Sequence, residues 1–137
     1  MRIVAAVAFG TAVCLGAPAA VRAEPPITRQ YSRTVDSNVE AQVGSSTAWT
    51  SECVARSITL TVTQMPGNGT VTVRDGPNRV VQNPAVGTAG ACVGKDVMGK
   101  QITYRSKPGF HGKDVVVYES VSDRGPKVVT TVNIEVR

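Results

Sequence analysis

The chain has 137 residues, of which 42% are hydrophobic and only 4% aromatic, and it carries a formal net charge of +5 at pH 7. This length allows one domain with a modest hydrophobic core. The charge is too small for the basic surface of a typical nucleic-acid-binding protein, so we expect no nucleic-acid partner.

Residues 1–23 have the pattern of a secretory signal peptide. A positive start is followed by an uncharged run from residue 3 to 20 that is rich in Ala, Val and Gly. Val21 and Ala23 occupy the third and first positions before a cut, so we place cleavage after Ala23, while 17–19 offers a second site. The alternative is a membrane anchor, because 18 uncharged residues approach the length of a span. The small residues and the processing pattern favour the signal peptide.

Cleavage would leave residues 24–137 as a single domain with 13 basic and 10 acidic residues, a charge of +3. It would also remove Cys14 and leave Cys53 and Cys92. Two cysteines in an exported domain most simply form one structural disulfide. A redox or metal pair is the alternative, but the two are not spaced as Cys-x-x-Cys, and a zinc site needs more ligands. We therefore expect a periplasmic or extracellular protein without a membrane span after cleavage.

Apolar residues that recur at every second position predict about seven short strands, separated by turns rich in Gly, Pro and Asn. Two of them are expected to form a β-hairpin through the turn Met65–Gly69. A turn is expected at Asp75–Asn78, and residues 75–100 as a whole are expected to be mainly loop and to contain Cys92. Ile102 and Tyr104 are expected to point inward, and Val116 and Tyr118 to share one face of their strand. The pattern indicates an all-β fold, a sandwich with Greek-key connections. In chain order, the predicted strands are one or two within 35–43, then 57–63, 70–74, a short edge strand at 79–82, 101–105, 114–121 and 127–136.

Residues 57–137 carry motifs of a known family. Met65-Pro66-Gly67-Asn68-Gly69-Thr70-Val71-Thr72-Val73 is followed by Ile102-Thr103-Tyr104 and by Pro108-Gly109-Phe110-x-Gly112-x-Asp114. In this order the segments resemble bacterial immunoglobulin-like and cadherin-like repeats, here in a single copy. The resemblance implies that residues 24–137 form an immunoglobulin-like β-sandwich of about seven strands. In the turn, Phe110 can plug the end of the sandwich and Asp114 can accept hydrogen bonds from turn amides.

No motif indicates a catalytic, cofactor or metal site, so we expect a protein that is not an enzyme and needs no cofactor. His111, the single histidine, lies in a glycine-flanked turn and is interpreted as an exposed structural residue. The acidic residues are scattered, so Asp114 and Asp123 are interpreted as turn formers rather than calcium ligands. Trp49, near Cys53, is expected to pack against the disulfide, with a surface role in binding as the alternative.

A local excess of positive charge lies between residues 95 and 113. It indicates either an anion-binding face or a set of solvated residues that discourage strand pairing at an edge. The candidate anion-binding residues are Lys95, Lys100, Arg105, Lys107 and Lys113.

The sequence thus predicts an exported, non-enzymatic binding or structural module of the bacterial periplasm or cell surface that recognises a protein or an envelope glycan. Two alternatives stay open. One is an enzyme or enzyme inhibitor that uses loops within residues 75–113. The other is an anion-binding envelope protein that uses the basic residues of 95–113.

Overall fold

The computed structural model describes residues 24–81 and 90–137. The predicted signal peptide lies outside the described residues, as does Gln82 of the predicted edge strand. In the part of the chain that is described, no helix has the length and apolar character needed to cross a membrane.

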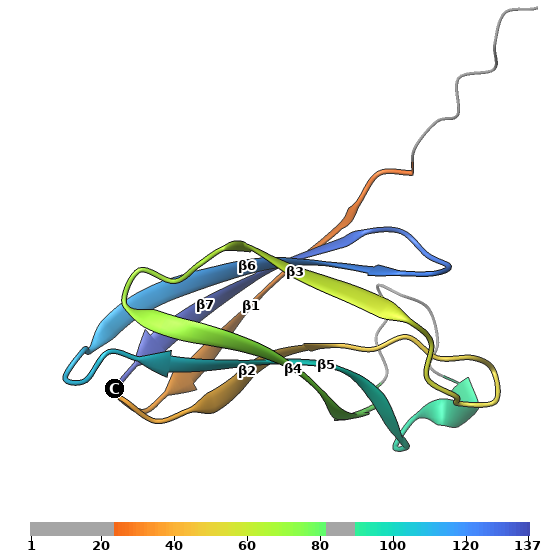
Figure 1. The fold of residues 1–137 in the computed structure, drawn as a ribbon, viewed down its shortest axis with the longest axis horizontal. Helices are drawn as coiled ribbons and strands as arrows, with labels where there is room; N and C mark the ends of the chain where they lie inside the picture. The colour runs from red at the N-terminus through yellow and green to blue at the C-terminus, as the bar shows by residue number, and fades with distance from the viewer. Residues whose placement is uncertain (1–23, 82–89) are drawn as a thin grey trace, which may run out of the picture.

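Seven strands form two sheets that face each other as a sandwich (Figure 1), which confirms the predicted all-β fold. One sheet has the strand order β1-β7-β6-β3 and the other has the order β2-β5-β4. A short 3₁₀ turn, Gly90–Cys92, precedes β5. The strands are β1 (Ile27–Val35), β2 (Ala41–Ser46), β3 (Ile58–Gln64), β4 (Gly69–Arg79), β5 (Asp96–Ser106), β6 (Gly112–Ser122) and β7 (Val128–Val136).

The first and last strands of the domain lie side by side. β1 pairs in parallel with β7, from Ile27 opposite Val128 to Val35 opposite Val136. β7 pairs antiparallel with β6, and β6 pairs antiparallel with β3. This pairing places the N-terminal end of β1 next to the turn between β6 and β7, at the end of the sandwich that also carries the disulfide (Figure 1).

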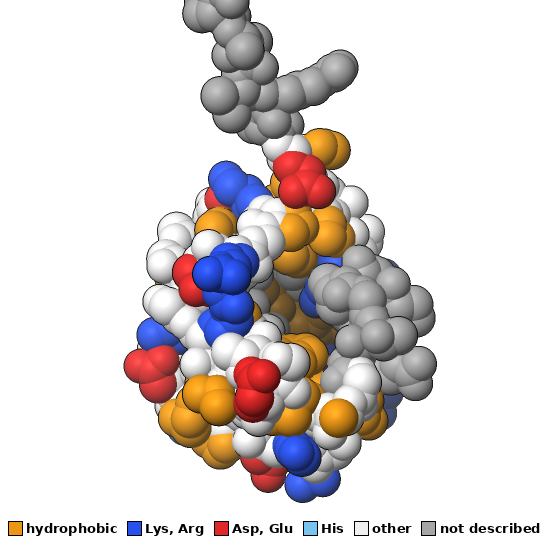
Figure 2. Space-filling model, turned by 90° about the vertical axis from the view of Figure 1, so that its right-hand side faces the viewer, with side chains coloured by type: hydrophobic (Ala, Val, Ile, Leu, Met, Phe, Trp, Pro, Cys, Tyr) orange, Lys and Arg blue, Asp and Glu red, His pale blue; other side chains and the backbone are white. Residues whose placement is uncertain are grey.

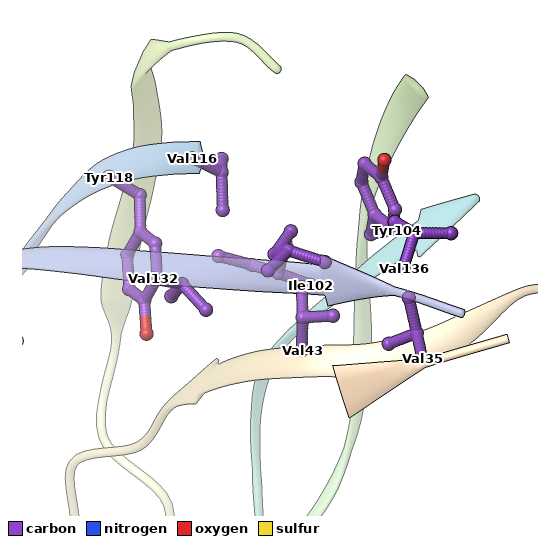
Figure 3. Close-up of a cluster of buried hydrophobic side chains, with 9 residues drawn as sticks. Val35, Val43, Ile102, Tyr104, Val116, Tyr118, Val132 and Val136 are labelled. Carbon is purple, nitrogen blue, oxygen red and sulfur yellow. The ribbon is translucent and has the colours of Figure 1, made fainter. Parts of the chain in front are cut away.

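The main core fills the space between the sheets, where Tyr118 and Val132 of one sheet face Ile102 and Val43 of the other (Figure 3). Ile102 and Tyr104, predicted to point inward, and Val116 and Tyr118, predicted to share one face, are all at most 2% exposed. Burial of each such large side chain contributes roughly 1.5–3 kcal/mol. The nine buried core residues are Val35, Val43, Ile102, Tyr104, Val116, Tyr118, Val132, Ile134 and Val136.

The predicted hairpin between residues 57–63 and 70–74 is wrong. β3 pairs with β6 in one sheet, whereas β4 pairs with β5 in the other, so the turn at 65–68 carries the chain across the sandwich. The Pro-Gly-Asn sequence ends a strand equally well in both arrangements. Which strand becomes the partner depends on β5 and β6, which follow much later in the chain.

The turn predicted at Asp75–Asn78 and the two ends of the loop predicted at 75–100 are also corrected. β4 continues without interruption through these residues to Arg79, and β5 already begins at Asp96. Pro77 has no backbone N–H group. It is compatible with a strand here because β4 is the edge strand of its sheet and donates no ladder hydrogen bond on its free side. Gly76 lies opposite Gly99 in the same ladder.

A second, smaller core lies at the disulfide end. Val80, Cys92 and Val97 are buried together, and Trp49 and Cys53 pack against them. Val97 and Ile102 are separated by an odd number of positions along one regular strand, so their side chains point to opposite faces of the β4–β5 hairpin. The part of the hairpin at the disulfide end, which contains Val97, therefore buries one face in the smaller core. The part that contains Ile102 buries the opposite face in the main core.

One glycine in the main core is required by a close approach. An alanine Cβ at Gly69 would lie 2.6 Å from Cζ of Tyr104 and 2.7 Å from the carbonyl oxygen of Arg105. The ring cannot move aside easily, because Tyr104 is 1% exposed and its hydroxyl group donates to Asp114 at 3.0 Å.

Gly69→Ala is expected to lower the free energy of unfolding by about 1–3 kcal/mol, since it overfills a packed core. Urea unfolding of the purified protein measures the change. Gly67→Ala is the matched control, because nothing lies within 4 Å of a Cβ built there. Equal stability of the two variants would contradict the close packing of Tyr104 on β4.

Candidate functional site

The predicted disulfide is present and joins two loops at one end of the sandwich. Cys53 follows β2 and Cys92 ends the 3₁₀ turn before β5, with Cα atoms 5.5 Å apart, a normal distance for a bridge. Cys92 is 2% exposed. Trp49 packs against the same cluster, as the sequence predicted. The bridge thus holds the segment between β2 and β3 against the base of β5.

An open cleft of about 440 Å³ lies between the two sheets at this disulfide end. Figure 2 looks at this end of the molecule and shows the hollow, with hydrophobic side chains inside it and Lys or Arg side chains along part of its rim. The volume is within the usual range of small-molecule sites, roughly 300–1,000 Å³. One sheet contributes Ile27, Arg29, Ile58, Ser120, Ser122 and Val128, and the other contributes Ser45, Ser46, Asn78 and Arg79.

Two tyrosines lie where the apolar core gives way to the residues that line the cleft. The hydroxyl groups of Tyr31 and Tyr118 lie 3.1 Å apart, and Tyr31 donates to the carbonyl oxygen of Val43 at 3.2 Å. Burial raises the pKa of Tyr31 above its usual value, and the neighbouring Tyr118 raises it further. Beyond this pair, the inward positions are polar, with Ser120 only 5% exposed.

A bulge in β2 makes room for the two tyrosines. The register of β2 against β5 shifts between Gln42 and Gly44, so Val43 and Gly44 are both buried. A Cβ at Gly44 would lie 3.0 Å from the hydroxyl oxygen of Tyr118 and 3.2 Å from that of Tyr31. A residue without a side chain therefore leaves room for both tyrosine hydroxyl groups beside the bulge.

Four arginines line the cleft, and two of them have carboxylate partners. Arg56 binds Asp123 through two hydrogen bonds of 2.8 and 2.6 Å, and this contact holds the pKa of the Asp123 carboxyl below its usual range. Arg79 pairs with Asp96 at 3.1 Å. Arg29 and Arg124 form no ion pair with any carboxylate in residues 24–81 or 90–137. The described lining contains no Asp or Glu, so the cleft is electropositive.

Arg29 has the most unusual environment of these four residues. It alternates with Ile27 and Tyr31 on the half-buried face of β1, which points between the sheets. Its Nε atom is buried and has no hydrogen-bond partner. A buried donor without a partner lowers the stability of the fold by about 1–3 kcal/mol, because it has lost its hydrogen bond to water. Arg29 was not among the site residues predicted from the sequence, although the alternation Ile27-x-Arg29-x-Tyr31 places it on an inward face.

The five basic residues predicted as an anion-binding face do not form one cluster. Lys95 precedes β5, whereas Lys107 and Lys113 follow it, at the opposite end of the sandwich. Lys100 pairs with Asp75 at 2.6 Å, and Lys107 Nζ donates to the carbonyl oxygen of Gly67 at 3.0 Å. Arg105 is exposed on β5. These residues are spread along the full length of β5.

The remaining residues singled out in the sequence lie outside the cleft or at its border. His111 is exposed in the turn between β5 and β6, at the end of the sandwich opposite to the cleft. Phe110, in the same turn, is half-buried and packs against the main core. Asp123 forms the ion pair with Arg56 described above. In the described part of the chain, no three His, Cys, Asp or Glu side chains gather as metal ligands would.

Asp114 connects three parts of the structure. Its carboxylate accepts hydrogen bonds from the backbone amides of Gly67 and Asn68, each at 2.9 Å, and from the Tyr104 hydroxyl at 3.0 Å. Burial raises the pKa of Tyr104, and the bond to Asp114 raises it further. The amides that Asp114 binds belong to the turn between β3 and β4, not to the neighbouring turn at 108–112.

Comparisons with known proteins give no relative for this chain. A scan against protein-family models finds no match, and searches of curated proteins and of solved structures find none either.

Proposed function

We propose that this protein is an exported, non-enzymatic binding module of the bacterial envelope that recognises an envelope glycan or protein through the cleft at its disulfide end. The observation that carries the proposal is the cleft itself, about 440 Å³ in volume and open to solvent. Its wall combines the Trp49 side chain with hydroxyl and guanidinium groups, a mixture that favours reversible binding of a polar ligand.

Three features support export and a sandwich of the immunoglobulin type. Residues 1–23 have the composition of a signal peptide. A disulfide such as Cys53–Cys92 is typical of oxidising compartments. The orders β2-β5-β4 and β3-β6-β7 correspond to strands B-E-D and C-F-G of immunoglobulin domains, and they agree with the family motifs in residues 57–137.

The composition of the cleft supports binding rather than catalysis. None of the described residues that line it is His, Cys, Asp or Glu, the usual general bases and nucleophiles. Its serines have no base beside them in the lining, and a serine hydroxyl is a weak nucleophile without one. The proposed module therefore holds its partner and releases it unchanged.

Site-specific photocrosslinking tests this function. A photoreactive side chain placed at Arg124, an exposed residue of the cleft lining, is expected to capture an envelope component when the protein is exported in living cells. The same side chain at His111, exposed at the other end of the sandwich, is the matched control. The readout is the crosslinked product and its mass after release. No product, the same products from both positions, or a chemically altered partner would contradict the proposal.

A further inference from the structure

We infer that the cleft binds a saccharide that carries carboxylate groups, and that Arg29 holds one of these carboxylates. The inference rests on the proposed binding function and specifies its ligand class. It follows from three observations: an arginine with an unpartnered buried donor, an electropositive wall without carboxylates, and a wall rich in hydroxyl groups beside the tryptophan.

The position of Arg29 indicates an anionic partner from outside the chain. A guanidinium group presents its donors in a planar fork that fits a carboxylate through two parallel hydrogen bonds. The nearby acidic side chains of Asp123 and Asp96 are already bound to Arg56 and Arg79. A ligand carboxylate in the cleft would give the Arg29 guanidinium group the anionic partner that it lacks within residues 24–81 and 90–137.

The rest of the wall favours a saccharide over an acidic peptide. Five serine and threonine residues belong to the lining of the cleft, and a hydroxyl group can both donate and accept a hydrogen bond, as the hydroxyl groups of a sugar do. They are Ser45, Ser46, Thr47, Ser120 and Ser122. The half-buried indole of Trp49 adds a rigid apolar surface with a polar N–H group. A bound peptide would instead be expected to extend a sheet through backbone hydrogen bonds at a free strand edge. This cleft lies between the sheets and is lined by side chains.

Trp49 is the only tryptophan of the chain, so its fluorescence reports on the cleft without a background signal. The probe is an oligosaccharide of hexuronic acids, added to the exported protein at low salt. The matched neutral probe is the same oligosaccharide after reduction of its carboxyl groups to alcohols. We expect saturable binding of the acidic probe, and binding of the neutral probe weaker by about tenfold or more, the usual value of a hydrogen-bonded charge pair.

Two variants locate the interaction. Arg29→Gln is expected to weaken binding of the acidic probe by about tenfold or more, and Arg29→Lys by less, because lysine keeps the charge but not the fork. Arg105→Gln removes the same charge from an exposed position of β5 outside the cleft and is expected to leave the affinity unchanged. Urea unfolding of each variant shows whether it is folded. The two wild-type titrations decide the question even if Arg29→Gln does not fold.

Each other outcome overturns the inference in a recognisable way. Equal binding of the acidic and neutral probes, or unchanged affinity of a folded Arg29→Gln variant, would refute carboxylate recognition by Arg29. An oligoglutamate peptide that binds more tightly than the saccharide would refute the ligand class. Absence of saccharide binding together with a partner crosslinked from position 124 would refute this inference alone. Absence of both would also refute the proposed binding function.

Discussion

Replacing both Cys53 and Cys92 by alanine is expected to lower the free energy of unfolding by about 4 kcal/mol, because the bridge closes a loop across a sequence separation of 39 residues. The closed loop contains β3 and β4, which lie in different sheets. Loss of the bridge therefore removes a constraint on a large part of the unfolded chain. For a domain of this size, such a change is a large share of a total stability of roughly 5–15 kcal/mol.

Urea unfolding measures this change. The dependence of the free energy on urea is expected to become steeper in the double variant, because an unfolded chain without a cross-link exposes more surface. Alanine at position 53 keeps the backbone cost of the positive φ angle of 65° found there, so this cost does not contribute to the difference. Wild-type protein treated with a reductant is the control and should match the variant. A loss below about 1 kcal/mol would mean that the small core around Val80 and Val97 holds this end without the bridge.

Replacing Asp114 by alanine is expected to cost about 3 kcal/mol, the second largest effect. The change leaves the amides of Gly67 and Asn68 and the buried hydroxyl group of Tyr104 without their acceptor. A hydrogen bond to a charged group contributes roughly 1.5–3 kcal/mol, and a buried donor that loses its partner is penalised in full. Asp114→Asn keeps one acceptor oxygen and is expected to be intermediate.

Thermal and urea unfolding measure the effect of the Asp114 variants, with Asp75→Ala as the control. The Asp75 side chain is 70% exposed and forms an ion pair with Lys100, so its removal is expected to cost less than about 1 kcal/mol. If Asp114→Ala were no more destabilising than Asp75→Ala, the three hydrogen bonds would not connect β6 to the turn between β3 and β4.

Local patterns were sufficient for much of the fold. The strict alternation in 101–105 and 127–136 predicted both the strands and their inward residues, because the side chains of a strand point to its two faces in turn. The disulfide followed from the two cysteines that remain after removal of the predicted signal peptide. Asp114 was correctly predicted to accept hydrogen bonds from amides, but those amides come from a different turn.

These local patterns did not predict which strands pair with each other. β3 and β4 have the alternation and the turn residues of a hairpin, and yet each pairs with a strand that begins at least 17 positions after its own end. Backbone hydrogen bonds are equivalent whichever strand supplies them, so the choice depends on burying both sheets against one core. The pairing of β4 with β5 is a second example. Gly76 and Pro77 predicted a turn at 75–78, but β4 pairs with β5 continuously through these residues.

The sequence by itself determined that the domain is all-β, which faces of its central strands are buried, and which cysteines can form the bridge. These properties depend on alternation and composition, which are local and need no knowledge of partners. Only the tertiary structure decided that the sheets separate at the disulfide end and that Arg29 lines the resulting cleft. Arg29 belongs to β1 and the serines to β2 and β6, and they share a site because β1 pairs with the last strand of the chain.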